Sequence, residues 1–166
     1  MTQTNFRLDG KVIIITGGVG LLGREYTRAV CEAGGIPVVA DLNGTQAEAV
    51  AHEMGAEAFG IGVDVSDKES VQAMKRRILD RYGRIDGLVN NAAINPKFDA
   101  GEKHLDTFED FPLEAWNQSL AVNVTGMFLC AQAVAPTMLE QGRGVIINIA
   151  STYGITGPDQ RLYIPD

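Results

Sequence analysis

Three evenly spaced glycines are the residues of this sequence with the clearest chemical use. The segment 16–23 reads TGGVGLLG and lies between an apolar run and the start of a helical pattern. We expect Gly17 to permit a tight exit from a strand, Gly20 to let backbone approach a pyrophosphate, and Gly23 to let helix and sheet pack closely. The N–H groups and the dipole of that helix terminus would then hold the phosphates of a dinucleotide.

Two aspartates that close apolar runs could bind the rest of such a nucleotide. Asp41 lies 24 positions after Gly17, about where the ribose-binding acid of a dinucleotide fold belongs. Against a 2′-phosphate this carboxylate would be repulsive, by about 4 kcal/mol for like charges roughly 4 Å apart at an effective dielectric near 20, which favours NAD over NADP. Asp64 could reach the adenine edge. For each aspartate alone, a helix cap or a solvated loop carboxylate is the other interpretation.

The elements that must position these residues are short apolar runs alternating with helical patterns. The runs predict five strands, at 11–16, 36–40, 57–63, 85–90 and 144–150. Apolar residues at spacings of three and four predict helices at 21–33, 45–53 and 71–82, and a long one from Leu113 past 131, with Pro112 in its first turn and a kink at Pro136. Ser66 or Asp67 would cap the third helix. This alternation predicts an α/β fold of Rossmann type, a doubly wound parallel sheet whose ligands bind beyond the carboxyl ends of the strands.

Length and composition narrow the class of protein. The chain has 166 residues, 45% hydrophobic and 21% charged, which predicts one domain over 1–166 with a sizeable core. Its net charge of −7 disfavours nucleic acid and anionic membrane surfaces as partners. No uninterrupted apolar run approaches about 18 residues, and the first ten residues show no export signal, so we expect no membrane span and a cytoplasmic location.

Cysteines and histidines do not form ligand clusters in this sequence. Cys31 and Cys130 have no CxxC spacing, and we expect both to be buried, reduced thiols on helices. His52 and His104 stand apart from other ligand-type residues. The sequence therefore predicts no metal site.

Taken jointly, the motifs resemble those of the short-chain dehydrogenases/reductases over nearly the whole chain, from Lys11 to about Gly157. The resemblance rests on TGGVGLLG at 16–23, Asp41, DV at 64–65, NNAA at 90–93, NVTG at 123–126 and INIAST at 147–152. The tract 144–163 is most similar to a bacterial group linked to flagellin or surface-sugar modification. Two positions depart from the family: Leu21 replaces a glycine of the short-form TGxxxGxG turn, giving the TGxxGxxG spacing of extended, epimerase-like relatives, and Ala93 replaces the last glycine of NNAG.

The resemblance also implies roles for individual residues. It implies that NAD binds with its pyrophosphate at Gly17, Val19, Gly20, Leu22 and Gly23 and its adenosine ribose at Asp41. The adenine would lie at Asp64 and Val65, and the central ribose region at Asn91, Ala92 and Ala93. Ser151 would hydrogen-bond the substrate oxygen, and Asn123 would hold a water in a proton relay. Without the resemblance, Asn123 is a polar residue inside a helix and Ser151 is a turn hydroxyl.

The family's proton donor, a Tyr followed four residues later by Lys, has no counterpart here. Tyr153 is followed by Gly157, and Tyr163 lies three residues before the final Asp166. We therefore expect the Tyr/Lys helix and the substrate lobe to lie beyond residue 166, so that the C-terminal part of the fold is missing.

Three functions remain open on this sequence. The first is an NAD-dependent oxidoreductase that transfers a hydride between nicotinamide and a secondary alcohol or carbonyl compound. The second is a nucleotide-sugar epimerase or dehydratase of the extended type, and the third is a non-catalytic dinucleotide-binding module. The helix that carries Asn123 is apolar on more than one side, which favours either a homodimer or homotetramer contact or burial within its own domain. The polar connection 92–111 is either an active-site or contact loop or a solvated insertion.

Overall fold

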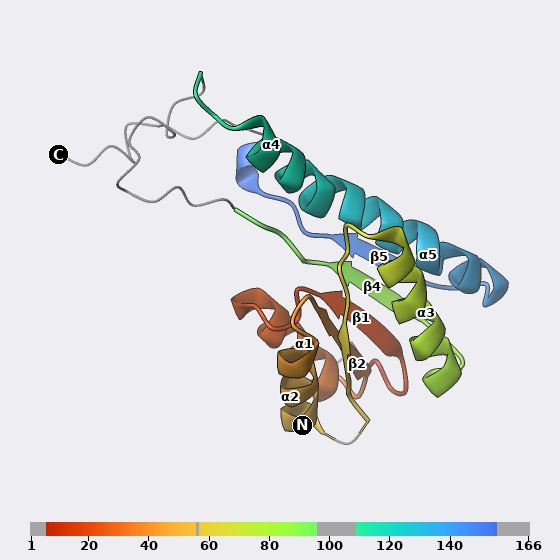
Figure 1. Ribbon diagram of the computed structural model, residues 1–166. Helices are drawn as coiled ribbons and strands as arrows, with labels where there is room; N and C mark the ends of the chain where they lie inside the picture. Colours follow the sequence, from red (N-terminus) through yellow and green to blue (C-terminus); the bar gives the residue numbers. More distant parts are fainter. Residues whose placement is uncertain (1–5, 56, 96–108, 156–166) are drawn as a thin grey trace.

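Five parallel strands form one sheet in the order β3-β2-β1-β4-β5 (Figure 1). The computed structural model describes residues 6–55, 57–95 and 109–155, so most of the connection 92–111, His104 and Tyr163 lie outside the described residues. The strands are β1 (Val12–Thr16), β2 (Ile36–Asp41), β3 (Phe59–Gly62), β4 (Gly87–Asn90) and β5 (Val145–Asn148). The predicted Rossmann-type α/β fold is therefore confirmed.

Helices connect the strands and cover both faces of the sheet around β1, whereas all four residues of the edge strand β5 are exposed. They are α1 (Leu21–Glu32), α2 (Gly44–Met54), α3 (Lys68–Tyr82), α4 (Leu113–Leu120) and α5 (Gly126–Glu140), with a 3-10 turn, η3 (Thr152–Gly154), after β5. Figure 1 shows α1 and α2 on one side of the sheet and α3 with the α4–α5 rod on the other. The strand order runs from β1 to β2 and β3 on one side and from β1 to β4 and β5 on the other, and crossovers of one hand in these two directions place their helices on opposite faces.

The central strand β1 is buried on both faces because alternate side chains meet different helices. Ile13 and Ile15 pack with Val30 of α1. Val12 and Ile14 belong to the larger cluster that includes side chains of α3 and α5. All five residues of β1 are buried, which is the environment that its β-branched run indicated.

Four of the observed strands are shorter than the predicted runs, because pairing with a neighbour defines a strand, whereas β2 extends one residue further, to Asp41. β3 pairs with only Val38–Asp41 of β2, and β4 pairs with three residues of β1. The structure also decides between the two predicted N-caps of α3. Asp67 caps α3 by accepting a hydrogen bond from Glu69 N–H at 3.0 Å, whereas Ser66 Oγ donates to Asp64.

The long helix predicted from Leu113 is interrupted. A π-helical turn, η2 (Ala121–Thr125), separates α4 from α5, and it contains Asn123. Pro112 precedes α4 as its N-cap instead of lying in its first turn, and Pro136 lies inside α5. Periodicity did not predict the π turn, because a single inserted residue barely changes an apolar pattern.

One side of the α4–α5 rod is apolar and exposed in the described part of the chain. Its exposed side chains are Leu113, Trp116, Leu120, Val124 and Phe128. By length and composition alone, the run Leu113–Glu140 is apolar enough to cross a bilayer, and only a minor part of it is buried in the structure. The sequence analysis did not single out this segment, because polar residues interrupt its apolar runs. The core helices of soluble proteins can be equally long and apolar, and the other side of α5 packs against the sheet.

The two cysteines differ in burial. Cys130 on α5 is fully buried, and burial raises the pKa of its thiol to about 12. Cys31, in the last turn of α1, is only half-buried, so the prediction of burial was wrong for this residue. Its Sγ lies 3.6 Å from the Met54 carbonyl oxygen at the end of α2, where the two helices leave it partly open to solvent.

A buried carboxylate joins the amino ends of the strands, opposite the carboxyl ends. Asp86 accepts two 2.6 Å hydrogen bonds from Arg84 and one of 3.1 Å from Val12 N–H, and the charged groups of Lys11 and Arg143 lie 3.5 and 3.8 Å away. Burial acts to raise the pKa of Asp86, but the hydrogen bonds from Arg84 and Val12 and the nearby positive charges outweigh it and lower that pKa. The ionised carboxylate therefore stabilises the start of β1 and β4.

Candidate functional site

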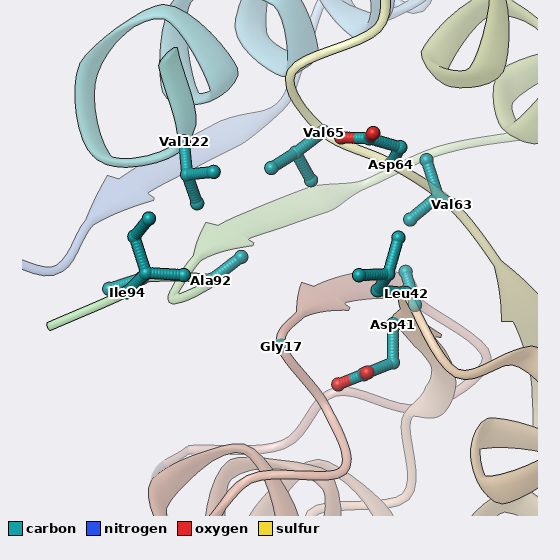
Figure 2. A pocket seen from close by; sticks show the side chains of 11 residues that line it. Gly17, Asp41, Leu42, Val63, Asp64, Val65, Ala92, Ile94 and Val122 are labelled. Atoms are coloured by element: carbon teal, nitrogen blue, oxygen red, sulfur yellow. The ribbon is translucent and has the colours of Figure 1, made fainter. Parts of the chain in front are cut away.

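A cleft of about 240 Å³ lies at the carboxyl ends of the strands. It lies beside β1, where the strand order reverses: β2 and β3 continue the sheet on one side of β1, and β4 and β5 on the other. Such a switch point is the usual ligand site of an open α/β sheet. Six residues predicted from the sequence line it: Gly17, Asp41, Asp64, Val65, Ala92 and Ala93. Leu42, Val63, Ile94 and Val122 add apolar walls (Figure 2). Polar groups at the rim and an apolar interior suit a heterocyclic ring joined to a sugar.

The glycine turn has no room for side chains at two of its three motif positions. Gly17 has a φ of +64°, and a Cβ there would lie 2.8 Å from the Cα of Ala92. A Cβ on Gly23 would overlap the carbonyl oxygen of Gly17 and lie 2.7 Å from the Cα of Gly18. At Gly20, by contrast, the nearest atom would be 3.3 Å away. A side chain at Gly20 would therefore fit only tightly, against the Gly17 carbonyl oxygen, whereas Gly17 and Gly23 leave no room for one.

The N-terminus of α1 differs from those of α2 and α3. The side chain of Asn43 caps α2 by accepting a hydrogen bond from Gln46 N–H at 3.1 Å, and Asp67 caps α3. α1 begins after Gly20, with no side-chain cap and no acidic residue in its first turn. Its first N–H groups and its positive dipole end therefore suit an anion, such as a pyrophosphate.

Asp41 lies at the end of β2 and already makes two hydrogen bonds to backbone. Its Oδ2 accepts from Val19 N–H at 3.1 Å, and its Oδ1 accepts from Asn43 N–H at 3.2 Å. These contacts orient the carboxylate beside the glycine turn, and each oxygen retains a lone pair for a further donor. In Figure 2 the Asp41 side chain extends toward the turn that follows Gly17.

Asp64 combines both interpretations that the sequence left open. Its Oδ1 accepts from Ser66 N–H at 2.9 Å and from Ser66 Oγ at 2.6 Å, so part of the carboxylate serves a local turn. Asp64 also lines the cleft. Val65 is buried beside it, and a Cβ on Gly126 would lie 2.8 Å from its Cγ2. The glycine of the NVTG motif thus lets the helical rod approach this wall of the cleft.

Asn91 holds the end of β4 against the glycine turn. Its Nδ2 donates to the carbonyl oxygens of Thr16 and Gly17 at 3.0 and 3.1 Å. The Thr16 hydroxyl oxygen accepts from the N–H groups of Asn91 and Ala92, each at 3.1 Å. Among the residues described, Asn91 therefore has a clear structural function, while Ala92 and Ala93 line the cleft.

Asn123 uses both ends of its side-chain amide on one residue. Its Oδ1 accepts from Ile94 N–H at 2.8 Å, and its Nδ2 donates to the Ile94 carbonyl oxygen at 2.9 Å. Because Asn123 lies in the π turn, this clamp joins the irregular part of the helix to the segment that leaves β4. Ile94 and Val122 line the cleft, so the clamp also shapes that wall.

The remaining predicted residues lie around the cleft. Val19, Gly20, Leu22 and Gly23 belong to the turn and first helical turn, and Leu22 is exposed. Ser151 follows β5, so it lies at the same carboxyl edge of the sheet. The expected Tyr/Lys pair, which the sequence analysis puts beyond residue 166, lies outside the described residues.

Sequence reasoning missed the side chains of Thr16, Arg24 and Asn90 and the backbone of Ile94, which support the site. Asn90, for example, donates to Asn148 Oδ1 at 2.8 Å and joins β4 to β5. Thr16 and Asn90 were present in the quoted motifs, and their position at strand ends was an available signal. The bonds of Arg24 and Ile94 depend on chain folding and had no such signal.

Comparisons with known proteins agree with this geometry. The family model described as short chain dehydrogenase matches residues 11–163. A D-threitol dehydrogenase from Mycolicibacterium smegmatis is 38% identical over 161 residues, covering 95% of this chain and 59% of the relative. A sorbitol dehydrogenase from Cereibacter sphaeroides is 40% identical over 152 residues, covering 91% and 56%.

A solved structure described as NAD+-bound xylitol dehydrogenase has a TM-score of 0.81 and 32% identity, covering 91% of this chain and 56% of its own. The chain thus spans somewhat more than half the length of the relatives it matches. The three relatives named here are polyol dehydrogenases by name, and none of them supports the resemblance to flagellin- or surface-sugar-modifying proteins.

Proposed function

The chain belongs to the short chain dehydrogenase family, and from this premise we propose that the protein is an NAD-dependent oxidoreductase. It would transfer a hydride between nicotinamide and a secondary alcohol or carbonyl carbon. The observation that carries the proposal is the oriented carboxylate of Asp41 beside an uncapped α1 N-terminus. The carboxylate suits ribose hydroxyls and repels a 2′-phosphate, and the helix terminus suits a pyrophosphate.

We assign the cofactor-binding residues by their place along the cleft. The glycine turn with Val19, Leu22 and α1 would hold the pyrophosphate, and Asp41 would hold the adenosine ribose. Asp64 and Val65 would lie along the adenine, and Asn91, Ala92 and Ala93 along the central ribose. The residues fit such a ligand because two motif glycines exclude side chains and the apolar walls suit a ring. NAD, when bound, supplies the hydride acceptor.

We propose that Ser151 hydrogen-bonds the substrate oxygen. We also propose that Asn123 supports the proton relay by fixing the backbone around it. Its side-chain amide is engaged by Ile94 at both ends. We propose that a relay water contacts backbone of the π turn and that Asn123 acts by holding that turn in place. The proton donor itself is the expected Tyr/Lys pair beyond residue 166, in a single NAD-binding domain of which this chain forms the larger part.

The proposed substrate is a small polyol with a secondary hydroxyl group. This follows the names of the threitol, sorbitol and xylitol dehydrogenases to which the chain is similar. We further propose a cytoplasmic protein that forms a homodimer or homotetramer, in which a second copy covers the exposed apolar side of the α4–α5 rod. Burial of that side against protein would account for its composition without a membrane.

Titration of the protein at its full natural length with NADH and NADPH tests the cofactor assignment. NADH should bind more tightly, and Asp41→Ala should weaken its binding by roughly 1.5–3 kcal/mol, as for a hydrogen bond to a charged group. Tighter binding of NADPH would contradict the role of Asp41.

Turnover of a polyol panel, followed at the nicotinamide absorbance band, tests the reaction. Ser151→Ala should abolish measurable turnover without loss of NADH binding, and unchanged turnover would remove Ser151 from the mechanism. Two other functions give different results. The TGxxGxxG spacing favours an epimerase or dehydratase, which would form product without net NADH change. A non-catalytic module would bind NADH and turn over nothing.

A further inference from the structure

One residue in the middle of the glycine turn, Val19, is held by side chains at the peptide unit before it and at the peptide unit after it. Val19 N–H donates to Asp41 Oδ2 at 3.1 Å, and the Val19 carbonyl oxygen accepts from Arg24 Nε at 3.1 Å. Arg24 is the fourth residue of α1, and its Nη1 lies 3.4 Å from Glu53 Oε2 in the last turn of α2. The contacts therefore run from β2 through the turn to α1 and α2.

The residues beside Val19 are held through backbone, Gly18 N–H on the Ala40 carbonyl oxygen and Gly20 N–H on the Gly17 carbonyl oxygen, each at 3.1 Å, whereas the Val19 carbonyl oxygen is held by the Arg24 side chain. Val19 is flanked by Gly18 and Gly20, and glycine has the largest backbone freedom to lose when a ligand orders the chain. A guanidinium N–H to a carbonyl is a charge-assisted bond, stronger than a neutral one. With its oxygen released, the peptide between Val19 and Gly20 would lose its side-chain contact, and the backbone of Val19, which joins it to the peptide bound by Asp41, would be less firmly placed.

We propose that Arg24 is a positioning residue for the dinucleotide site. By holding the Val19 carbonyl oxygen, it sets the conformation of the turn and keeps the Asp41 carboxylate oriented toward the ribose position. This inference rests on the proposed function, since it names a determinant of affinity at the same site. It gives Arg24 no contact with the reacting atoms.

A purely structural role for Arg24 predicts a different outcome. The Arg24 and Glu53 side chains are 42% and 60% exposed, and ion pairs at such positions contribute little to stability. Loss of Arg24 should therefore change the unfolding midpoint little while weakening the cofactor site. The comparison of affinity with stability separates the two roles.

The experiment compares Arg24→Met, which keeps the apolar stem and removes every donor, with Arg24→Lys, which restores one donor and the charge. Arg28→Met is the matched control, because Arg28 lies one turn further along α1, is similarly exposed and pairs with Glu25 at 2.6 Å. Each variant is made in the protein at its full natural length. NADH affinity is measured by fluorescence titration, unfolding by urea, and kcat and KM by steady-state kinetics.

We expect Arg24→Met to weaken NADH binding about tenfold, the factor that corresponds to roughly 1.4 kcal/mol for one charge-assisted bond. The loss should fall on KM for NADH, with an unchanged urea midpoint, and Arg24→Lys should recover part of the affinity. Arg28→Met should match the unsubstituted protein in both measurements.

Three results would overturn the inference or its premise, and they can be told apart. Wild-type NADH affinity in Arg24→Met, with the unsubstituted protein binding NADH, would refute the positioning role alone. Equal losses of affinity and stability, with Arg24→Lys no better than Arg24→Met, would assign Arg24 a structural role and also refute it. Failure of the unsubstituted protein to bind either NADH or NADPH would refute the proposed function itself.

Discussion

The glycines at 20 and 23 belong to one motif, but their surroundings predict opposite responses to the same added methyl group. In Gly23→Ala the new Cβ would overlap the Gly17 carbonyl oxygen and lie 2.7 Å from Gly18 Cα. Both distances are shorter than 3.0 Å, the practical lower limit for contacts of a Cβ atom. Both neighbours are backbone, so the turn itself must move. In Gly20→Ala the nearest atom, the Gly17 carbonyl oxygen, is 3.3 Å away, a tight contact that a small shift relieves, and the φ of −67° suits alanine.

These distances set the expected magnitudes. Overpacking of this kind typically costs about 1–3 kcal/mol. Replacing a helical glycine by alanine returns roughly 0.5–1 kcal/mol, so Gly23→Ala should still lower the free energy of unfolding. Gly20→Ala should change it by no more than about 0.5 kcal/mol. If pyrophosphate approaches the backbone at Gly20, however, the methyl group should weaken NADH binding at least about tenfold, or roughly 1.4 kcal/mol.

Urea unfolding and NADH titration on the two variants make the test. We expect Gly23→Ala to lose both stability and affinity, and Gly20→Ala to lose affinity alone. Each variant is the control for the other, because the substitution is identical and the sites are three residues apart. A Gly23→Ala protein as stable as the unsubstituted one would refute the close-packing argument. A Gly20→Ala protein that binds NADH normally would refute the backbone approach to the phosphates.

Three further predictions concern groups outside the turn. Hydrogen bonds and nearby cations lower the pKa of Asp86 in the folded chain, so its contribution to stability is complete above the ordinary carboxyl pKa range and is lost as pH falls through the folded pKa. Asp86→Asn should therefore lower the free energy of unfolding by roughly 1.5–3 kcal/mol at neutral pH, measured by urea unfolding. The variant should also lose less stability than the unsubstituted protein as the pH is lowered. Cys130, with a pKa of about 12, should be only about 10⁻⁴ thiolate near pH 8 and should react with a thiol reagent only after denaturation; fast labelling in the native protein would contradict its burial. Asn123→Ala should lower the free energy of unfolding by about 1–3 kcal/mol because both Ile94 backbone groups lose their partner, and the exposed Asn117→Ala should leave it within about 0.5 kcal/mol; equal effects would show that the clamp is not specific.

Sequence pattern was sufficient for the order and type of the elements. β-Branched runs such as Val12–Thr16 are buried on both faces in a parallel sheet, and this environment leaves a local record in the residue types. The glycine turn and Asp41 could be found for the same reason, since φ above zero, close packing and a strand-end carboxylate each demand a residue type at a given spacing. The predicted strand and helix ends were less accurate, because pairing partners and caps define them.

Tertiary structure alone decided which polar groups serve ligand sites and which serve the fold. The sequence could name Asn91 and Asn123, but only the folded chain brings them to Thr16 and Ile94, residues 75 and 29 positions away. It also decided the π turn around Asn123, the half-exposure of Cys31 and the bond from Arg24 to Val19. The physical reason is that apolar periodicity is a property of local chain, whereas a hydrogen bond depends on where the fold brings its two partners.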